Sequence, residues 1–535
     1  MKGKTMDALK NFREKDFIEQ TKLLSEIEKE KKTDAVPDLF DLHETPLNDQ
    51  AVDSMVTHTL RSLLAQSEEA TVRGIRSGKP KAEALSIHMA GECRFLAAGP
   101  VLMELVGKEK DPAILFEILS ALSKIKTPES LEFFRKNTRH QEPAIASLCV
   151  ETLGLWEDIA SLPLFGKIIE EGEGDDRYEE CDLLTWSAIK AMSTLRSDEA
   201  LAFLVSKIHH RSPAARRLIH QALVDKGRAA IPFLAHPFLE DDVDAKIHAA
   251  QLLGLIPDRK AGEALAAALV SGAADDPNIK YNIYESLGKV PFVKGIECLM
   301  AGLSEKDDLV LLAVISTLNK RFNARAIEKI AELITCGDAQ GEKIATAIVV
   351  SKSLNIFEAL HANKSAFDKL LAAIPKTKDP VVITAFRSKL KSMKTGEAAP
   401  EAAKLSSPFA GTGLRILAVD DSRLMLFFYR TAASKVGFNI TTAINGSEAL
   451  DILEKGEEFD LIVTDLNMPI MDGIEFTRKV RARSDMGKIK IIMATTESKQ
   501  SQVDLARKVG VDDFIQKPFT EEVFQKKIQA LLSGS

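Results

Sequence analysis

VTDLNMPIMDG, residues 463–473, has the form of a short buried strand that ends in an acid and runs into a turn. Three further stretches share this form, namely LAVDDSRL (417–424), IIMATTES (491–498) and DDFIQKPF (512–519). Each contains apolar residues followed by charged or hydroxyl-bearing ones, and segments with helical periodicity separate the stretches. Short apolar strands that alternate with amphipathic helices predict a parallel sheet built from βαβ units.

The predicted strands and helices alternate along the whole C-terminal part of the chain. We predict strands at Arg415–Asp420, Asn439–Ala443, Leu461–Asp465, Ile489–Ala494 and Asp513–Gln516. The intervening helices are expected to begin near Ser422, Gly446, Gly473, Lys499 and Thr520. In an open parallel sheet, ligands bind beyond the carboxyl ends of the strands, so the residues at those ends are the candidates for a site.

Acidic, hydroxyl and basic side chains stand at the predicted strand ends. Asp420 and Asp421 end the first strand, Asp465 ends the third, Thr495 follows the fourth, and Lys517 follows the fifth. Three carboxylates in a small pocket repel one another unless a cation joins them, and hard oxygen ligands suit Mg²⁺. A carboxylate can then act as a nucleophile toward a phosphoryl group, while a hydroxyl and an ammonium stabilise the phosphoryl oxygens. The pattern predicts a phosphoacceptor site.

Together the four stretches resemble the receiver domain of two-component response regulators, over residues 414–535. The resemblance implies a flavodoxin-like, doubly wound sheet of five parallel strands in the order 2-1-3-4-5. It also implies that Asp465 accepts a phosphoryl group from a histidine kinase or a phosphotransfer protein. The domain would catalyse only its own phosphorylation from a phosphodonor and its own dephosphorylation, so the chain is not expected to be an enzyme in the ordinary sense.

The resemblance assigns the magnesium ligands residue by residue. It implies that Asp421 binds Mg²⁺ directly, together with the phosphorylated Asp465. Asp420 would assist through a water molecule, and Asn467 would contribute its backbone carbonyl.

The remaining assignments concern the phosphoryl group and the switch. Lys517 is expected to pair with the phosphoryl group at the family's usual cis peptide with Pro518, and Thr495 to swing toward the phosphoryl group. Phe514 holds the place of the aromatic that turns inward with Thr495, but it lacks the hydroxyl of the tyrosine that many relatives have there. Thr496 is bulkier than the small residue usually found after the switch threonine. These two departures bear on how long the phosphorylated state lasts and on how its output partner recognises it.

Residues 70–394 show helical periodicity almost throughout, with apolar residues at i, i+3, i+4 and i+7. A tripeptide in which an apolar residue is usually followed by a small one recurs at intervals of 30 to 39 residues. We call the third residues of these tripeptides the ladder; they are Gly91, Ser123, Gly154, Ser193, Val224, Gly254, Gly288 and Asn319. This period predicts repeated pairs of antiparallel helices, in which the small residue lets neighbouring helices approach closely.

The ladder resembles HEAT repeats of the short bacterial type that also occur in phycobilin lyases. The resemblance implies a right-handed α-solenoid, a class of fold that usually binds other proteins along an extended surface. Residues 1–69 are predicted to form a partly flexible N-terminal helical arm. Residues 395–413 (TGEAAPEAAKLSSPFAGTG) are predicted to be a flexible linker, because their composition cannot form a core.

Composition narrows the classes of function. The 71 Lys and Arg are outnumbered by 78 Asp and Glu, and the net charge of -7 argues against nucleic-acid binding. Five cysteines stand singly, which predicts reduced thiols rather than disulfides or a zinc site. No apolar run approaches the roughly 20 residues of a membrane-spanning helix. We therefore expect a cytoplasmic protein.

The sequence thus predicts a multidomain response regulator whose receiver controls the binding of an unidentified protein to the solenoid. It shows no recognisable DNA-binding, cyclase or methylesterase output. Phosphorylation is expected to reposition the helix after Thr495, about Gln500–Val509, and to change its docking. Two alternatives stay open: a phosphate sink that the solenoid docks near a kinase, and a receiver-regulated enzyme of the bilin-lyase type.

Overall fold

The computed structural model describes residues 9, 11–45, 47, 49–173, 181–291, 295–377, 379–393, 414–455, 458–468, 470–483, 486, 489–496 and 500–533. The predicted linker, 395–413, lies outside these residues, as does the expected helix start at Lys499. The chain separates into two compact units, Met1–Ala200 and Leu201–Ser535.

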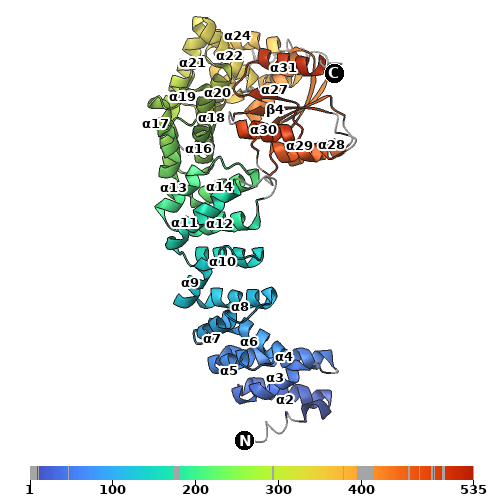
Figure 1. Cartoon of the computed structure of the whole chain (residues 1–535). Helices are drawn as coiled ribbons and strands as arrows, with labels where there is room; N and C mark the ends of the chain where they lie inside the picture. The colour runs from blue at the N-terminus through green and yellow to red at the C-terminus, as the bar shows by residue number, and fades with distance from the viewer. Residues whose placement is uncertain are drawn as a thin grey trace. The chain divides into compact units, whose positions relative to one another are not determined.

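α-Helices fill most of the described part of the first unit (Figure 1). They are α2 (Phe17–Lys29), α3 (Val36–Glu44), α4 (Gln50–Gln66), α5 (Glu68–Ile75), α6 (Pro80–Cys93), α7 (Ala98–Val106), α8 (Pro112–Ile125), α9 (Pro128–Lys136), α10 (Pro143–Leu155), α11 (Leu162–Gly172) and α12 (Leu183–Thr194), while α13 (Asp198–Ser206) spans the division between the units. From α2 to α10, each even-numbered helix packs against the next even-numbered one, so that the series ends at α12.

The second unit begins with helices packed in the same alternating way. They are α14 (Pro213–Lys226), α15 (Ile231–Ala235), α16 (Val243–Leu255), α17 (Arg259–Val270), α18 (Pro277–Leu287), α19 (Gly295–Gly302), α20 (Asp308–Arg321), α21 (Ala324–Cys336), α22 (Ala339–Val350), α23 (Leu354–Leu360), α24 (Lys364–Ala373) and α25 (Pro380–Ser392). Among the described helices, none is both long and apolar enough to cross a bilayer. The prediction of a large all-helical region is confirmed.

The ladder residues lie in, or directly after, the even-numbered helices α6 to α20. A Cβ atom added to Gly154 would stand 2.5 Å from the Cα of Ala191 on the next even-numbered helix. One added to Gly254 would stand 2.5 Å from the Oγ of Ser286. These separations are too short for any side chain, so glycine is required there, and the small residue has the close-packing role that the sequence predicts.

The N-terminal segment shares a core with the helices that follow it. Phe12, Leu24 and Ile27 are fully buried in a cluster that extends through α3 and α4 to Met89 of α6. Asp16 begins α2 by accepting a hydrogen bond from the backbone N–H of Glu19 at 2.8 Å. The apolar residues of this segment that enter the cluster are therefore packed against the helices that follow, while the partly flexible character of the arm stays a prediction.

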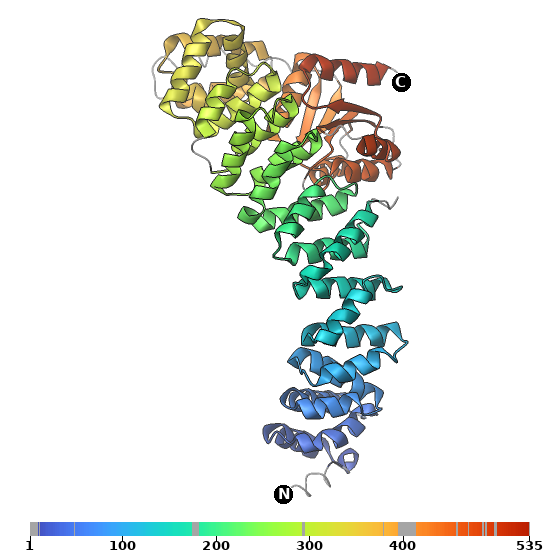
Figure 2. The ribbon, with the colours of Figure 1, turned by 60° about the vertical axis from the view of Figure 1, so that its left-hand side comes forward.

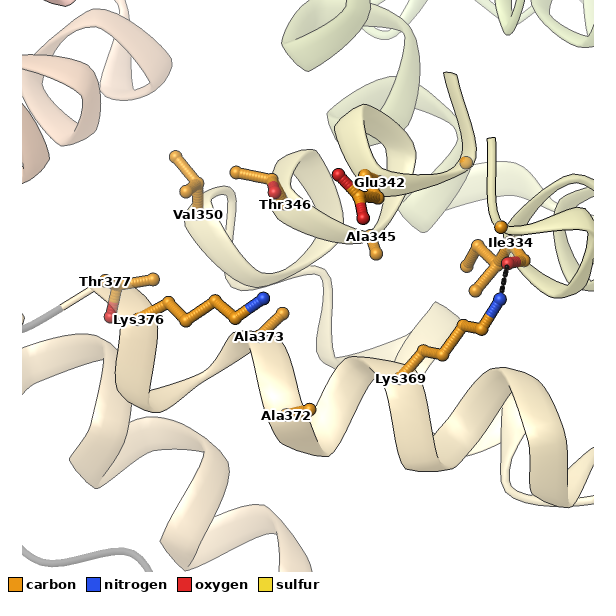
Figure 3. Close-up of a pocket in the computed structure, with 12 residues that line it drawn as sticks. Ile334, Glu342, Ala345, Thr346, Val350, Lys369, Ala372, Ala373, Lys376 and Thr377 are labelled. Carbon is orange, nitrogen blue, oxygen red and sulfur yellow. Dashed lines mark hydrogen bonds between the residues drawn. The ribbon is translucent and has the colours of Figure 1, made fainter. Parts of the chain in front are cut away.

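A pocket of about 370 Å³ lies among α21, α22 and α24 (Figure 3). The Nζ atom of Lys369 donates to the carbonyl oxygens of Ile334 (2.9 Å) and Thr335 (3.1 Å) at the end of α21. The last carbonyls of a helix have no partner within it, and a lysine there also complements the helix dipole. This lysine therefore has a structural task at the C-terminus of α21.

The remainder of the second unit is a five-stranded parallel sheet with helices on both faces (Figures 1 and 2). The strands β1 (Arg415–Val419), β2 (Asn439–Ala443), β3 (Leu461–Asp465), β4 (Lys490–Thr495) and β5 (Asp513–Gln516) follow the predicted order β2-β1-β3-β4-β5. The helices are α27 (Arg423–Lys435), α28 (Gly446–Glu454), α29 (Gly473–Arg481), α30 (Gln500–Lys508) and α31 (Glu521–Ser533).

The apolar runs of the central strands follow from burial on both faces. All of β3 is buried, as is β1 from Ile416 onward, which explains why these strands lack polar alternation. In the register, Val419 stands opposite Thr464, and Asp465 stands opposite Ala494. This alignment brings the carboxyl ends of β1, β3 and β4 to the same edge of the sheet.

Candidate phosphoacceptor site

Three carboxylates meet at the carboxyl edge of the sheet. Asp420 and Asp421 directly follow β1, and Asp465 ends β3. One oxygen from each lies within 4.8 Å of the others. Asp420 is fully buried and Asp465 nearly so, whereas Asp421 is exposed and opens the pocket to solvent. The structure therefore brings together the acids that the sequence placed at separate strand ends.

A buried lysine joins two of these acids. The Nζ atom of Lys517 donates to Oδ2 of Asp420 at 2.6 Å and to Oδ1 of Asp465 at 2.8 Å. The backbone N–H of Lys517 donates to the carbonyl oxygen of Thr495 at 2.8 Å, which fixes the end of β5 beside the end of β4. The Lys517–Pro518 peptide bond is cis, as the resemblance implies.

Two further groups hold Asp420, and neither was among the predicted site residues. The backbone N–H of Ser422 donates to its Oδ1 at 2.9 Å, and the hydroxyl of Tyr429 donates to its Oδ2 at 3.3 Å. Ser422 also caps α27, since its Oγ accepts from the N–H of Met425 at 3.3 Å. Tyr429 lies on α27, seven residues after Ser422, and its surroundings in the sequence do not mark it as a partner of Asp420.

Burial raises the pKa of Asp420 to about 7 and the pKa of Asp465 to about 6, although the ammonium of Lys517 opposes both shifts. Burial disfavours the ammonium of Lys517, but the two carboxylates raise its pKa above the ordinary value. Desolvation by the surrounding protein raises the pKa of Asp421 to about 6, and the negative charges of Asp420 and Glu285 add to the shift. Three carboxylates against one ammonium leave an excess of negative charge.

This donor set fits Mg²⁺. The pocket offers hard carboxylate oxygens, excess negative charge and an open side for the water molecules that Mg²⁺ retains. Asn467, whose carbonyl was predicted as a ligand, lies two residues after Asp465 and is half-buried. The acidic cluster of Asp420, Asp421 and Asp465 is thus of the kind that forms the magnesium site of a receiver domain.

The loop after Asp465 is held close to the strand. A Cβ atom on Gly473 would stand 2.1 Å from the carbonyl oxygen of Asp465, so only glycine can begin α29 at this place. Asp472 caps the helix by accepting from the N–H of Glu475 at 2.8 Å. The glycine and the acid of the NMPIMDG stretch therefore position the loop that frames the pocket.

The predicted switch residues lie near the same edge. Thr495 ends β4 and is buried, and Thr496 after it is also buried. Phe514 lies in β5 and is half-buried, with the Arg507 guanidinium carbon 5.8 Å from the centre of its ring. The movement of Thr495 and Phe514, and any obstruction by Thr496, stay predictions.

Comparison with known proteins agrees with this geometry. Residues 416–529 match the family model of the response regulator receiver domain. The chain is 38% identical over 120 residues to a chemotaxis protein CheY homolog of Campylobacter jejuni, a match that covers 22% of this chain and 92% of that protein. It is 37% identical over 120 residues to chemotaxis protein CheY1 of Helicobacter pylori, covering 22% of this chain and 97% of that protein. The solved structure of Vibrio cholerae CheY4 is 36% identical, with a TM-score of 0.22, and covers 23% of this chain and 100% of that structure.

A pocket of three aspartates and one lysine, at the carboxyl edge of a 2-1-3-4-5 sheet, defines a domain of the phosphoacceptor class. The chain belongs to the response regulator receiver family through its C-terminal domain. The family implies a histidine kinase as the source of the phosphoryl group. These matches cover about a fifth of the chain, so the function of the helical region has to be argued from its own structure.

Proposed function

We propose that the protein is a response regulator that is phosphorylated on Asp465. The observation that carries the proposal is the ammonium of Lys517, which is held 2.8 Å from Oδ1 of Asp465 inside a pocket with two further carboxylates. An ammonium at this position would pair with a phosphoryl oxygen once the acyl phosphate has formed. The same pocket leaves the carboxylate of Asp465 as the nucleophile.

The proposed step is the transfer of one phosphoryl group from a phosphohistidine of a kinase or phosphotransfer protein. A carboxylate oxygen of Asp465 forms a bond to phosphorus while the phosphorus–nitrogen bond breaks, and the electron pair of that bond stays on the histidine nitrogen. Asp421, Asp465 and the carbonyl of Asn467 would hold Mg²⁺, which supplies positive charge for the phosphoryl oxygens when it is bound. The ammonium of Lys517 would pair with a phosphoryl oxygen, and Thr495 would donate its hydroxyl to the phosphoryl group.

The helical region is proposed to be the output. The stacking of even-numbered helices within each unit supports the HEAT-like repeats predicted from the ladder, and such repeats offer long surfaces for protein binding. Phosphorylation of Asp465 would then change which protein binds this surface. A phosphate sink remains the alternative. A sink would be phosphorylated in the same way, but the set of proteins that it binds would not change on phosphorylation.

Phosphorylation of the full-length protein by phosphoramidate tests the proposal. With Mg²⁺ present, we expect intact mass spectrometry to show one added phosphoryl group on the wild type, and none when EDTA removes Mg²⁺. Asp465→Asn should abolish the label, whereas Asp451→Asn, on the exposed face of α28, should keep it. A label that persists in Asp465→Asn would show that the phosphoacceptor lies elsewhere.

A pulldown from cell lysate separates the output role from the sink. Wild type and Asp465→Asn would each be used with and without beryllofluoride and Mg²⁺, which mimic the phosphorylated state. An output role requires that the bound proteins change with the mimic in the wild type alone. The same set of proteins in all four conditions would favour the sink.

A further inference from the structure

Helix α18 contacts the residue that follows the magnesium-binding aspartates. The hydroxyl of Tyr281 lies 3.0 Å from Oγ of Ser422, and this Oγ donates to Oε1 of Glu285 at 2.8 Å. Tyr281 and Glu285 are four residues apart and therefore share one face of α18. Tyr281 and Ser422 are both buried, so this is an ordered polar contact between the helical region and the receiver.

Helix α14 contacts the loop that follows Asp465. Arg216 donates from Nη2 to Oδ1 of Asn467 at 3.1 Å and is itself buried. Arg217 donates from Nη1 to Oδ2 of Asp472 at 2.5 Å, and its Nη2 lies 3.7 Å from Oε2 of Glu475. The side chain of Arg217 is 39% exposed, so its ion pairs are partly screened.

The two contacts fall on two different segments that border the phosphoacceptor pocket. Ser422 comes directly after Asp421, whereas Asn467 and Asp472 belong to the loop directly after Asp465. Helix α27, which begins beside Ser422, also packs against α20 and α22. The receiver is therefore held by α14 and α18 at its phosphoacceptor pocket and by α20 and α22 along α27.

We propose that α14 and α18 form an intramolecular interface on two segments of the rim of the phosphoacceptor pocket, and that a phosphodonor gains full access only when this interface separates. The inference rests on the proposed function. A donor has to deliver its phosphoryl group to Asp465 between the Ser422 segment and the Asn467–Asp472 loop, which are the two segments that the helices contact. Glu285 of α18 and Lys289, directly after this helix, both place charges beside Asp421, so the docked helix also alters the electrostatics of the pocket.

Reversing the charge of Arg217 tests the interface in the full-length protein. Arg217→Glu turns its attraction to Asp472 and Glu475 into repulsion while leaving the aspartates and the lysine of the pocket unchanged. We expect the rate of phosphorylation by phosphoramidate to rise roughly tenfold, because two partly screened ion pairs are each replaced by repulsion. Hydrogen exchange should quicken in peptides from α14 and α29.

A charge swap provides the rescue. Arg217→Glu combined with Glu475→Arg restores opposite charges across the interface, and both the rate and the exchange should return toward wild type. Arg228→Glu is the matched control, because the carboxylate nearest to it, that of Asp258, belongs to the helical region itself. Arg228→Glu should change neither the rate of phosphorylation nor the hydrogen exchange of α14 and α29.

The two readouts separate failure of the interface from failure of the proposed function. Faster exchange with an unchanged phosphorylation rate would overturn the gating role, and no change in either would overturn the interface. A protein that is never phosphorylated, yet shows exchange that responds to Arg217→Glu and to the swap, would retain the interface and refute the phosphoacceptor proposal.

Discussion

Replacing Asp421 with asparagine is expected to stabilise the receiver domain in the absence of divalent cations. The pKa of Asp421 is raised from 3.8 to about 6, so its ionised form is disfavoured in the folded state. A shift of about two pKa units corresponds to roughly 3 kcal/mol near pH 7. Because Asp421 is exposed, screening by solvent reduces this figure, and we expect a gain of about 1 kcal/mol in the free energy of unfolding.

The stability has to be measured within the receiver. The two tryptophans, Trp156 and Trp186, both belong to the first unit, so their fluorescence reports on that unit. Native-state hydrogen exchange of the buried strands β1, β3 and β4 gives the opening free energy of the sheet directly. Asp451→Asn serves as the control, because it removes a carboxylate on the exposed face of α28.

Magnesium and pH supply the decisive comparisons. Mg²⁺ should stabilise the wild type more than Asp421→Asn, because the variant lacks one of the expected ligands. A raised folded pKa means that the folded state binds the proton more tightly, so this contribution is present below about pH 4 and is lost as pH rises toward about 6. The wild type should therefore lose stability relative to the variant over this range. Equal stability in metal-free buffer near pH 7, or equal stabilisation by Mg²⁺, would refute the reasoning.

Two further predictions concern the first unit and use tryptophan fluorescence during urea unfolding. Gly154→Ala should lower the free energy of unfolding by about 1–3 kcal/mol, because its Cβ would stand 2.5 Å from the Cα of Ala191, whereas Gly107→Ala meets only ordinary contacts and should have little effect. Asp158→Asn should cost about 1–2 kcal/mol near pH 7, because the bidentate hydrogen bonds from Arg135 lower the pKa of Asp158. A lowered folded pKa gives stability that is present above about pH 4 and lost below it, so the difference between wild type and Asp158→Asn should shrink toward about pH 3. A difference that stays constant with pH would contradict this assignment.

The receiver fold and its acidic pocket could be predicted because their signals are local in sequence. Each strand is a short apolar run, and each functional side chain comes at the end of such a run. In a parallel sheet, the carboxyl ends necessarily share one edge, so Asp420, Asp465 and Lys517 had to converge once the strands were recognised. The helix start near Gly473 was likewise predicted, but the requirement for glycine there depends on the close approach of the loop to the carbonyl oxygen of Asp465, which only the structure shows.

Other features could not be predicted because their signals are not local. The hydroxyl of Tyr429 reaches Asp420 from a helix that reads as an ordinary amphipathic segment. Arg216 and Asn467 are 251 residues apart, and nothing in either neighbourhood indicates the other. A change in docking of the helix after Thr495 on phosphorylation stays a prediction, and the contacts described above, which come from the pocket rim, α27 and α29, have no signal in the sequence.

The interface connects the ladder to the proposed output. The receiver is contacted by α14, α18, α20 and α22, all of them even-numbered helices of the kind that the ladder packs together. Since α27 begins at the pocket rim and also packs on α20 and α22, separation at the pocket is expected to move the receiver as one body. A protein that binds the uncovered face of these helices would then favour the separated state and, by thermodynamic linkage, the entry of the phosphoryl group. Phosphorylation and partner binding would thus favour each other without any direct contact between the two ligands.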